Sequence, residues 1–148
     1  MKHLFKYLGL FTICTLLFNS CATSNAVIAS GVNIHNYKYV IFGETTDGDM
    51  ELTDIVLMTQ NEISRVLTNL PEEEAGSYAQ RGGYVLSPHI NVKRQTDAYG
   101  GGTTDITINF HDFVSNQIVA VIKSSGMDID GYFAIEAIRE RLHQVFLR

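Results

Sequence analysis

Cysteine is nearly absent from this 148-residue chain, and the two that occur, Cys14 and Cys21, both lie near its start. The part that follows Cys21 holds no thiol, which excludes an internal disulfide and a thiol nucleophile there. A domain formed by that part must therefore be stabilised by its hydrophobic core alone.

Long hydrophobic runs are also missing. The longest apolar stretch, residues 8–18, is about eleven residues long, whereas a membrane-spanning helix needs roughly twenty. Lys2 and Lys6 precede this stretch, no acid occurs before Glu44, and the small residue Ser20 follows it. A basic start, a short apolar run and a small-residue end are typical of a secretory signal, so residues 1–20 are predicted to be a signal peptide.

The segment Leu17-Phe18-Asn19-Ser20-Cys21 resembles a bacterial lipobox, although Phe18 and Asn19 replace its usual small or branched residues. The resemblance implies that Cys21 receives a diacylglycerol and palmitate-type acyl chains and becomes the first residue of the mature protein. Because Ala22 rather than Asp follows, it also implies an outer-membrane lipoprotein that faces the periplasm. The alternative is an ordinary cleaved signal that ends near Ala22 or Ala26 and leaves Cys21 unmodified.

Positive charge is scarce after the signal. Removal of residues 1–20 takes away Lys2 and Lys6 and no acid, so the net charge falls from −5 to about −7. This charge argues against a nucleic-acid partner and against electrostatic docking on anionic lipids. The membrane partner is then reached through the lipid on Cys21, and residues 21–33, which are small and mostly polar, are predicted to form a tether. The alternative within this segment is a short edge strand at Val27 and Ile28.

The remaining residues, 34–148, show the pattern of one domain. Strands are predicted at residues 37–42, at 83–86 with a continuation to 94, at 105–110 and at 117–124. Helices are predicted at residues 53–70, where Pro71 ends the pattern, and at 132–146. Pro88 favours a bulge or an edge position, and residues 71–82 are expected to be a loop.

The order β-α-β-β-β-α predicts an α+β fold, a two-layer sandwich in which two helices cover one face of a mixed sheet of about four strands. The other face would then carry Asp105, Thr107 and Asn109 beside Val119 and Val121, and it is the candidate surface for a partner or for self-association.

This order resembles that of small bacterial envelope lipoprotein domains, among them the N-terminal domain of TolB and the lipoprotein activators of penicillin-binding proteins. The segments that carry the likeness are residues 37–42, 61–67, 83–86, 105–110 and 134–146. The resemblance implies a binding or assembly role with another envelope component rather than catalysis, and it transfers no site residue to this chain.

Catalytic and cofactor signatures are lacking. Gly100-Gly101-Gly102 leads into a strand and is predicted to be a turn rather than a phosphate loop, and no serine has a nucleophile-elbow context. If the predicted strand at residues 83–94 pairs with the predicted strand at residues 105–110, His89 and His111 approach one another. With Asp112 or Asp97 they would then form a zinc site, although no HxH or HExxH spacing supports it. We therefore expect a non-enzymatic protein without a cofactor. The alternative is a periplasmic small-ligand or metal-dependent protein that uses His89, His111 and Asp112.

Overall fold

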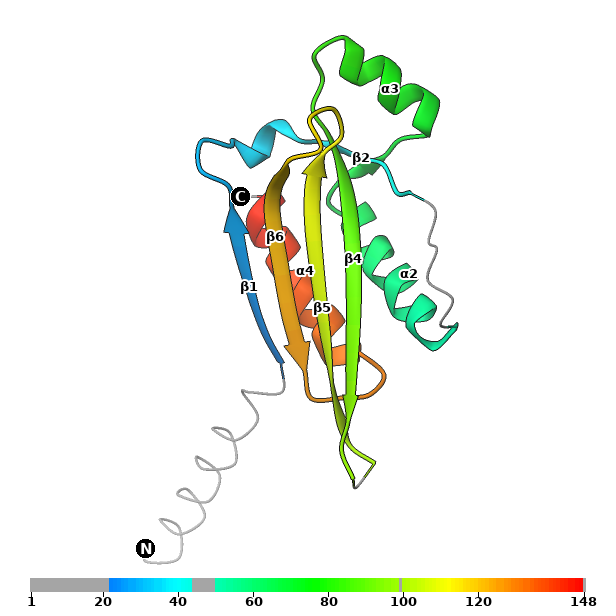
Figure 1. Cartoon of the computed structure of the whole chain (residues 1–148). Coiled ribbons are helices and arrows are strands. Elements are labelled where there is room, and N and C mark those ends of the chain that lie inside the picture. The colour runs from blue at the N-terminus through cyan, green and yellow to red at the C-terminus, as the bar shows by residue number, and fades with distance from the viewer. Residues whose placement is uncertain (1–21, 44–49, 99, 148) are drawn as a thin grey trace, which may run out of the picture.

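The structure is a computed structural model that describes residues 22–43, 50–98 and 100–147 (Figure 1). The predicted signal peptide and Cys21 lie outside these residues. In chain order the elements are β1 (Ala22–Ile28), a 3₁₀ turn (Ile34–Asn36), β2 (Tyr39–Val40), α2 (Met50–Ser64), β3 (Thr68–Asn69), α3 (Glu72–Gln80), β4 (Val85–Thr96), β5 (Gly102–Asp112), β6 (Ile118–Gly126) and α4 (Tyr132–Phe146).

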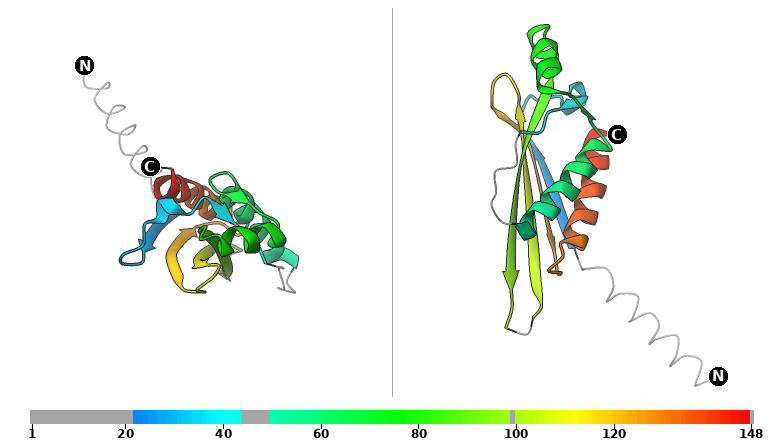
Figure 2. Two further views of the ribbon diagram at one scale, coloured as in Figure 1. Left: turned by 90° about the horizontal axis from the view of Figure 1, so that it is seen from above. Right: turned by 90° about the vertical axis from the view of Figure 1, so that its right-hand side faces the viewer.

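The strands form one mixed sheet in the order β1-β6-β5-β4-β2-β3. The strands β1, β6, β5 and β4 pair antiparallel, whereas β2 lies parallel to both β4 and β3. Helices α2 and α4 pack side by side on one face of the sheet, and α3 projects from one end (Figures 1 and 2). The predicted α+β class and the placement of two helices on one face are confirmed, but the described sheet has six strands rather than four.

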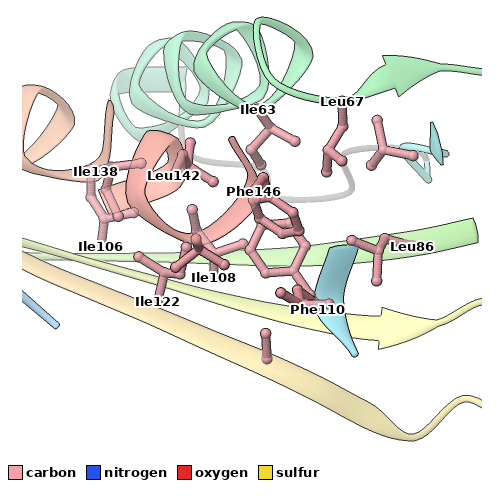
Figure 3. Close-up of a cluster of buried hydrophobic side chains, with 14 of the residues drawn as sticks. Ile63, Leu67, Leu86, Ile106, Ile108, Phe110, Ile122, Ile138, Leu142 and Phe146 are labelled. Carbon is pink, nitrogen blue, oxygen red and sulfur yellow. The ribbon is translucent and has the colours of Figure 1, made fainter. Parts of the chain in front are cut away.

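The core lies between the sheet and these two helices (Figure 3). Alternate residues of β5, Ile106, Ile108 and Phe110, are fully buried and meet Ile138 and Leu142 of α4. The ring of Phe110 packs edge-on against that of Phe146, with centroids 5.4 Å apart. Burial of each such side chain stabilises the fold by about 1.5–3 kcal/mol, which explains how a domain without disulfides is held together.

The prediction that residues 21–33 form a tether was wrong, because Ala22–Ile28 is an edge strand paired with β6. Arg141 of α4 holds this strand: its Nη2 donates a hydrogen bond of 2.6 Å to the Ser24 carbonyl oxygen. The half-buried residues Ala22, Ser24 and Ala26 alternate with exposed neighbours. These side chains are too small to give a hydrophobic contrast in the sequence, so a strand there resembles a linker.

The prediction of a loop at residues 71–82 was also wrong, because Glu72–Gln80 is helix α3. Three glutamates occupy its first turn, where a negative charge interacts favourably with the helix dipole. Only Ala75 is buried on this helix, so it lacks the apolar stripe by which a helix is recognised in a sequence. The preceding helix ends at Ser64 rather than at residue 70, and a turn at residues 65–67 leads into the short strand β3.

Pro88 lies within β4, beyond the two residues of that strand that β2 pairs with. Of the two predicted alternatives, a bulge or an edge position, the local edge fits: β4 lies inside the sheet, but among the described residues no strand pairs with it at Pro88 on the side away from β5. Within the described part of the chain, no helix is long and apolar enough to cross a membrane.

Candidate functional site

The sheet face opposite α2 and α4 is not covered by any helix of the described residues, and we call it the open face (Figure 2). Side chains alternate between the two faces of each strand, so the register of the sheet determines which residues meet there. One row across four strands is Thr23, Ser125, Asp105 and Lys93, and the next row is Asn25, Lys123, Thr107 and Asn91. All eight side chains are polar.

These two rows enclose a hollow of about 480 Å³, which we call the polar hollow. Its lining consists of Thr23, Ser24, Asn25, Asn91, Lys93, Asp105, Thr107, Lys123, Ser124 and Ser125. Hydroxyl and amide groups each donate and accept hydrogen bonds, the two lysines only donate, and Asp105 only accepts. The polar hollow thus presents both kinds of hydrogen-bonding group, with one more positive than negative charge in an otherwise acidic protein.

Farther along the strands the open face becomes more apolar. Val27 pairs with Val121, and Ile118 pairs with His111. The predicted neighbour Val119 is not there: a register shift between Phe110 and His111 turns it into the core, where it is 5% exposed. The same shift places Ile118, opposite His111, on the open face, where it is 48% exposed.

His89 and His111 meet on the open face, as the pairing of their strands predicted. Their ring centroids are 4.5 Å apart and the ring planes differ by 31°, so the imidazoles stack. His111 is further fixed by its Nδ1, which lies 3.2 Å from the Asn116 carbonyl oxygen.

Asp112 does not join the two histidines. It follows His111 on the same strand, so its side chain points to the opposite face. There its carboxylate accepts hydrogen bonds from Tyr37 Oη (3.1 Å), the Ser115 N–H (2.7 Å) and hydroxyl (2.9 Å), and the Val114 N–H (3.2 Å). Burial acts to raise the pKa of Asp112, but the hydrogen bonds outweigh it and hold the pKa below its usual value.

Asp97 is also remote from the histidines. It lies beyond Thr96 at the tip of the β4–β5 hairpin, where its Oδ1 accepts the Gly101 N–H at 2.8 Å. With a rise of about 3.3 Å per residue, eight residues separate it from His89 by roughly 25 Å. Among the described residues, no group of three or more His, Cys, Asp or Glu side chains is placed to hold a metal ion.

A second hollow, of about 560 Å³, lies beside α3 and is lined by Tyr39, Leu70, Glu73, Glu74, Ser77, Tyr78 and Arg81. Tyr39 and Tyr78 pack edge-on with centroids 4.7 Å apart. This arrangement explains why α3 stays attached to the sheet.

Sequence reasoning found Asp105 and Thr107 but missed most of the polar hollow. Alternation along 85–96 and 118–126 would have placed Asn91, Lys93, Lys123 and Ser125 on one face if strand pairing had been applied to them. Thr23 and Asn25 gave no such signal, because the strand that carries them was assigned to a tether.

No protein-family model matches the chain, and a search of curated proteins finds no match. Among solved structures, a PelC dodecamer from Paraburkholderia phytofirmans is similar over 86% of this chain and 99% of its own, with 15% identity and a TM-score of 0.52. A PDZ domain protein from Parabacteroides distasonis (10% identity, TM-score 0.47) is matched over 84% of this chain and 35% of its own. A minor lipoprotein from Acinetobacter baumannii (11% identity, TM-score 0.37) is matched over 74% and 89%.

The likeness to the PelC subunit bears on the fold class and on nothing finer. The chain has the two-layer α+β architecture seen in the PelC subunit, built around an open and polar sheet face. The α+β class expected from the sequence is supported at this level.

Proposed function

We propose that this chain is a lipid-anchored envelope protein that binds another envelope component through the polar hollow, with the lipid on Cys21. The observation that carries the binding role is the hollow itself, which gathers eight polar side chains from four strands on a face that no described helix covers. These side chains do not contribute to the hydrophobic core. The pairing of the edge strand β1 with β6 brings Thr23 and Asn25 into the two rows.

The anchoring part rests on the signal-like residues 1–20 and the lipobox-like segment that ends at Cys21. Intact-mass and peptide mass spectrometry of the protein purified from membranes test it. We expect a mature chain that begins at an acylated Cys21, and a Cys21→Ser variant that leaves the membrane fraction. An unmodified chain that starts downstream of Cys21 would disprove the anchor.

Site-specific photo-crosslinking in intact bacteria tests the binding role. A crosslinking amino acid at Thr107, in the polar hollow, is expected to capture one specific envelope component. The matched control carries it at Glu140, an exposed position on α4. The same adducts from both positions, or none from Thr107, would contradict a binding site in the polar hollow.

A substitution completes the test. Thr107→Arg fills the polar hollow and is expected to abolish capture by a crosslinker placed at Asn91. Because the side chain faces outward, the free energy of unfolding should change by no more than about 0.5 kcal/mol.

Self-assembly is a second candidate, favoured by the position and composition of β1. This strand lies at the edge of the sheet and exposes Val27 (64%) and Ile28 (41%). Exposed apolar residues on an edge strand favour pairing with another chain, and the PelC subunit of the same fold is found in a dodecamer. Light scattering of the purified protein tests this: Val27→Lys should reduce the mass of any oligomer, and a monomer at all concentrations would exclude it.

The proposed role is binding rather than catalysis. The metal-dependent alternative needs a third ligand beside His89 and His111, and the carboxylate of Asp112 points to the other face. Metal analysis of the purified protein distinguishes the two, since stoichiometric zinc would contradict the binding role as proposed.

A further inference from the structure

One end of the domain gathers the start of β1, the end of β6 and the start of α4 (Figure 1). Ala22 pairs with Gly126, which in turn pairs with Thr104 of β5. Cys21 is bonded to Ala22, and consecutive Cα atoms lie about 3.8 Å apart. A lipid on Cys21 is therefore attached at this end, with no linker between the lipid and the sheet.

Three large side chains are exposed at the same end. Met127 follows β6 and is 72% exposed, and Tyr132 (65%) and Phe133 (40%) form the first turn of α4. The two rings pack edge-on with centroids 6.0 Å apart. We call these three residues the apolar cap.

The backbone holds the apolar cap in place. The Phe133 N–H donates to Asp128 Oδ2 at 3.1 Å, and Thr104 Oγ1 donates to the Asp128 carbonyl oxygen at 2.7 Å. Gly131 has a φ of +73°, and a Cβ there would lie 3.1 Å from Ile55 Cδ1. The turn from β6 into α4 is thus fixed against the body of the domain, so the exposure of the cap follows from the fold.

We infer that the apolar cap rests on the surface of the bilayer that holds the lipid of Cys21. This inference rests on the proposed lipid anchor. Two acyl chains keep the domain at the bilayer, and they do so at the end where the cap is exposed. Tyrosine is enriched at membrane interfaces because its ring is apolar and its hydroxyl is polar, which suits Tyr132.

Charge distinguishes this contact from electrostatic docking. The turn that carries Met127 also carries Asp128 and Asp130 and no lysine or arginine. Anionic lipids do not attract such a turn, so the contact depends on burial of apolar area and does not weaken as the salt concentration rises. A patch made for an acidic protein partner would show the opposite sign of charge.

The contact also sets the orientation of the domain. The β4–β5 hairpin extends past Thr104 by two residue pairs, Gln95 with Thr103 and Thr96 with Gly102, and by the turn beyond them (Figure 2). For the apolar cap to reach the bilayer, the domain therefore leans with its α4 side toward it. The row from Thr23 to Lys93 then lies nearest the membrane, and α3 lies at the far end. A partner that enters the polar hollow meets it close to the lipid headgroups.

The chain contains no tryptophan, which makes a single introduced tryptophan a clean reporter. The full-length lipoprotein with Phe133→Trp is purified and reconstituted into vesicles of phosphatidylethanolamine and phosphatidylglycerol that contain lipids brominated on their acyl chains. The control is Val114→Trp, since Val114 is 70% exposed in the β5–β6 turn at the opposite end. Mass spectrometry of the same samples reads acylation of Cys21.

We expect acylated protein in which the brominated lipids strongly quench the tryptophan at position 133, at low and high salt, and leave the tryptophan at position 114 unchanged. Acylated protein with equal quenching at the two positions would overturn the inference and leave the anchor standing. A shift in the emission of the tryptophan at position 133 without quenching means that protein covers the cap, and this also overturns it. Protein that lacks acyl chains and leaves the vesicles would overturn the anchor, and with it the lipid-held contact.

Discussion

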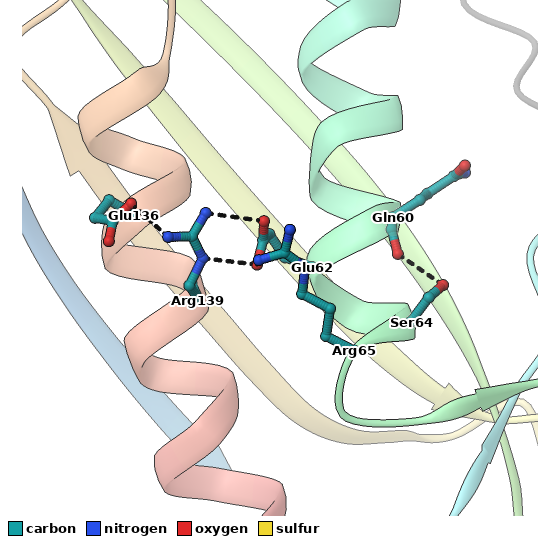
Figure 4. Close-up of polar contacts among 6 residues, drawn as sticks. All are labelled: Gln60, Glu62, Ser64, Arg65, Glu136 and Arg139. Atoms are coloured by element: carbon teal, nitrogen blue, oxygen red, sulfur yellow. Dashed lines mark hydrogen bonds and ion pairs between the residues drawn. The ribbon is translucent and has the colours of Figure 1, made fainter.

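Glu62 of α2 and Arg139 of α4 join the two helices by a two-pronged ion pair (Figure 4). Arg139 Nε lies 2.8 Å from Glu62 Oε2, and Arg139 Nη2 lies 3.1 Å from Oε1. The Glu62 side chain is 6% exposed and also meets Arg65, whereas Arg139 is 34% exposed and uses its Nη1 to reach Glu136 at 2.8 Å. The charge of Glu62 is thus buried and compensated, and it fixes how the two helices pair above the sheet.

Removal of the buried partner is expected to destabilise the domain. Glu62→Ala leaves Arg139 without its two-pronged acceptor, and we expect a loss of about 2 kcal/mol in the free energy of unfolding, below the value for a fully buried pair because Arg139 is partly solvated. Glu136→Ala, which removes the exposed partner of the same arginine, should cost less than about 1 kcal/mol. Urea unfolding followed by circular dichroism measures both, and equal losses would contradict this account.

The ion pair between Glu62 and Arg139 is expected to make the stability of the domain decrease at acid pH. The hydrogen bond and charge of Arg139 lower the pKa of Glu62 below its usual value of 4.5, although burial opposes the shift. A lowered folded-state pKa means that the stabilisation is fully present above pH 4.5 and is lost as the pH falls through the lower folded value. The stability difference between wild type and Glu62→Gln should therefore shrink below pH 4.5. A difference that stays constant down to the acid transition would show that Glu62 does not titrate in this way.

A strand can be predicted from the sequence only where apolar and polar side chains alternate along it. In β5 the buried Ile106, Ile108 and Phe110 alternate with polar residues, and the strand was predicted from that alternation. In β1 the inward residues are Ala and Ser, so the sequence suggested at most a short edge strand at Val27 and Ile28, and the contribution of β1 to the polar hollow was not visible. Together with β3, which lies where the sequence predicted the end of a helix, this strand explains why the sheet is wider than predicted.

In the candidate site, too, the features that follow from local sequence pattern could be predicted, whereas those that depend on how two strands fit together could not. The approach of His89 and His111 followed from strand pairing alone. Alternation between faces also predicts that Asp112 points away from His111, a step that the zinc hypothesis did not take. The register shift that sends Val119 inward depends on how two strands fit together, and no local feature of residues 117–124 signals it.

Tyr37 is expected to give the domain a sensitivity to alkali. Its hydroxyl donates to Asp112, and burial together with that carboxylate raises its pKa from 10.0 to about 12. A raised folded-state pKa means that the stabilisation is present below pH 10 and is lost as the pH rises toward 12. Tyr37→Phe should cost about 1 kcal/mol at neutral pH and lose less stability than wild type between pH 10 and 12. Urea unfolding of the two proteins at neutral pH and between pH 10 and 12 measures this, and a stability difference that stays the same across that range would contradict it.

Two glycines should respond to alanine in opposite directions. A Cβ at Gly126 would lie 2.5 Å from the backbone nitrogen of Ala134, where the first turn of α4 presses on the end of β6. Strand β6 and helix α4 cannot move apart without disturbing the turn that joins them. Gly126→Ala is therefore expected to lower the free energy of unfolding by about 1–3 kcal/mol. A Cβ at Gly76, in the middle of α3, meets nothing within 4 Å. Gly76→Ala should therefore stabilise α3 by about 0.5–1 kcal/mol, because alanine favours the helix.

Equilibrium unfolding in urea measures the effect at Gly126, and hydrogen exchange of the α3 amides measures the effect at Gly76. Because Gly126 lies beside Met127, its alanine variant also moves the apolar cap, so it should weaken the quenching of a tryptophan at position 133. Gly76→Ala lies at the far end and should leave that quenching unchanged. A Gly126→Ala variant as stable as wild type would mean that α4 and β6 are packed less closely than the structure places them, and that the cap is free to shift.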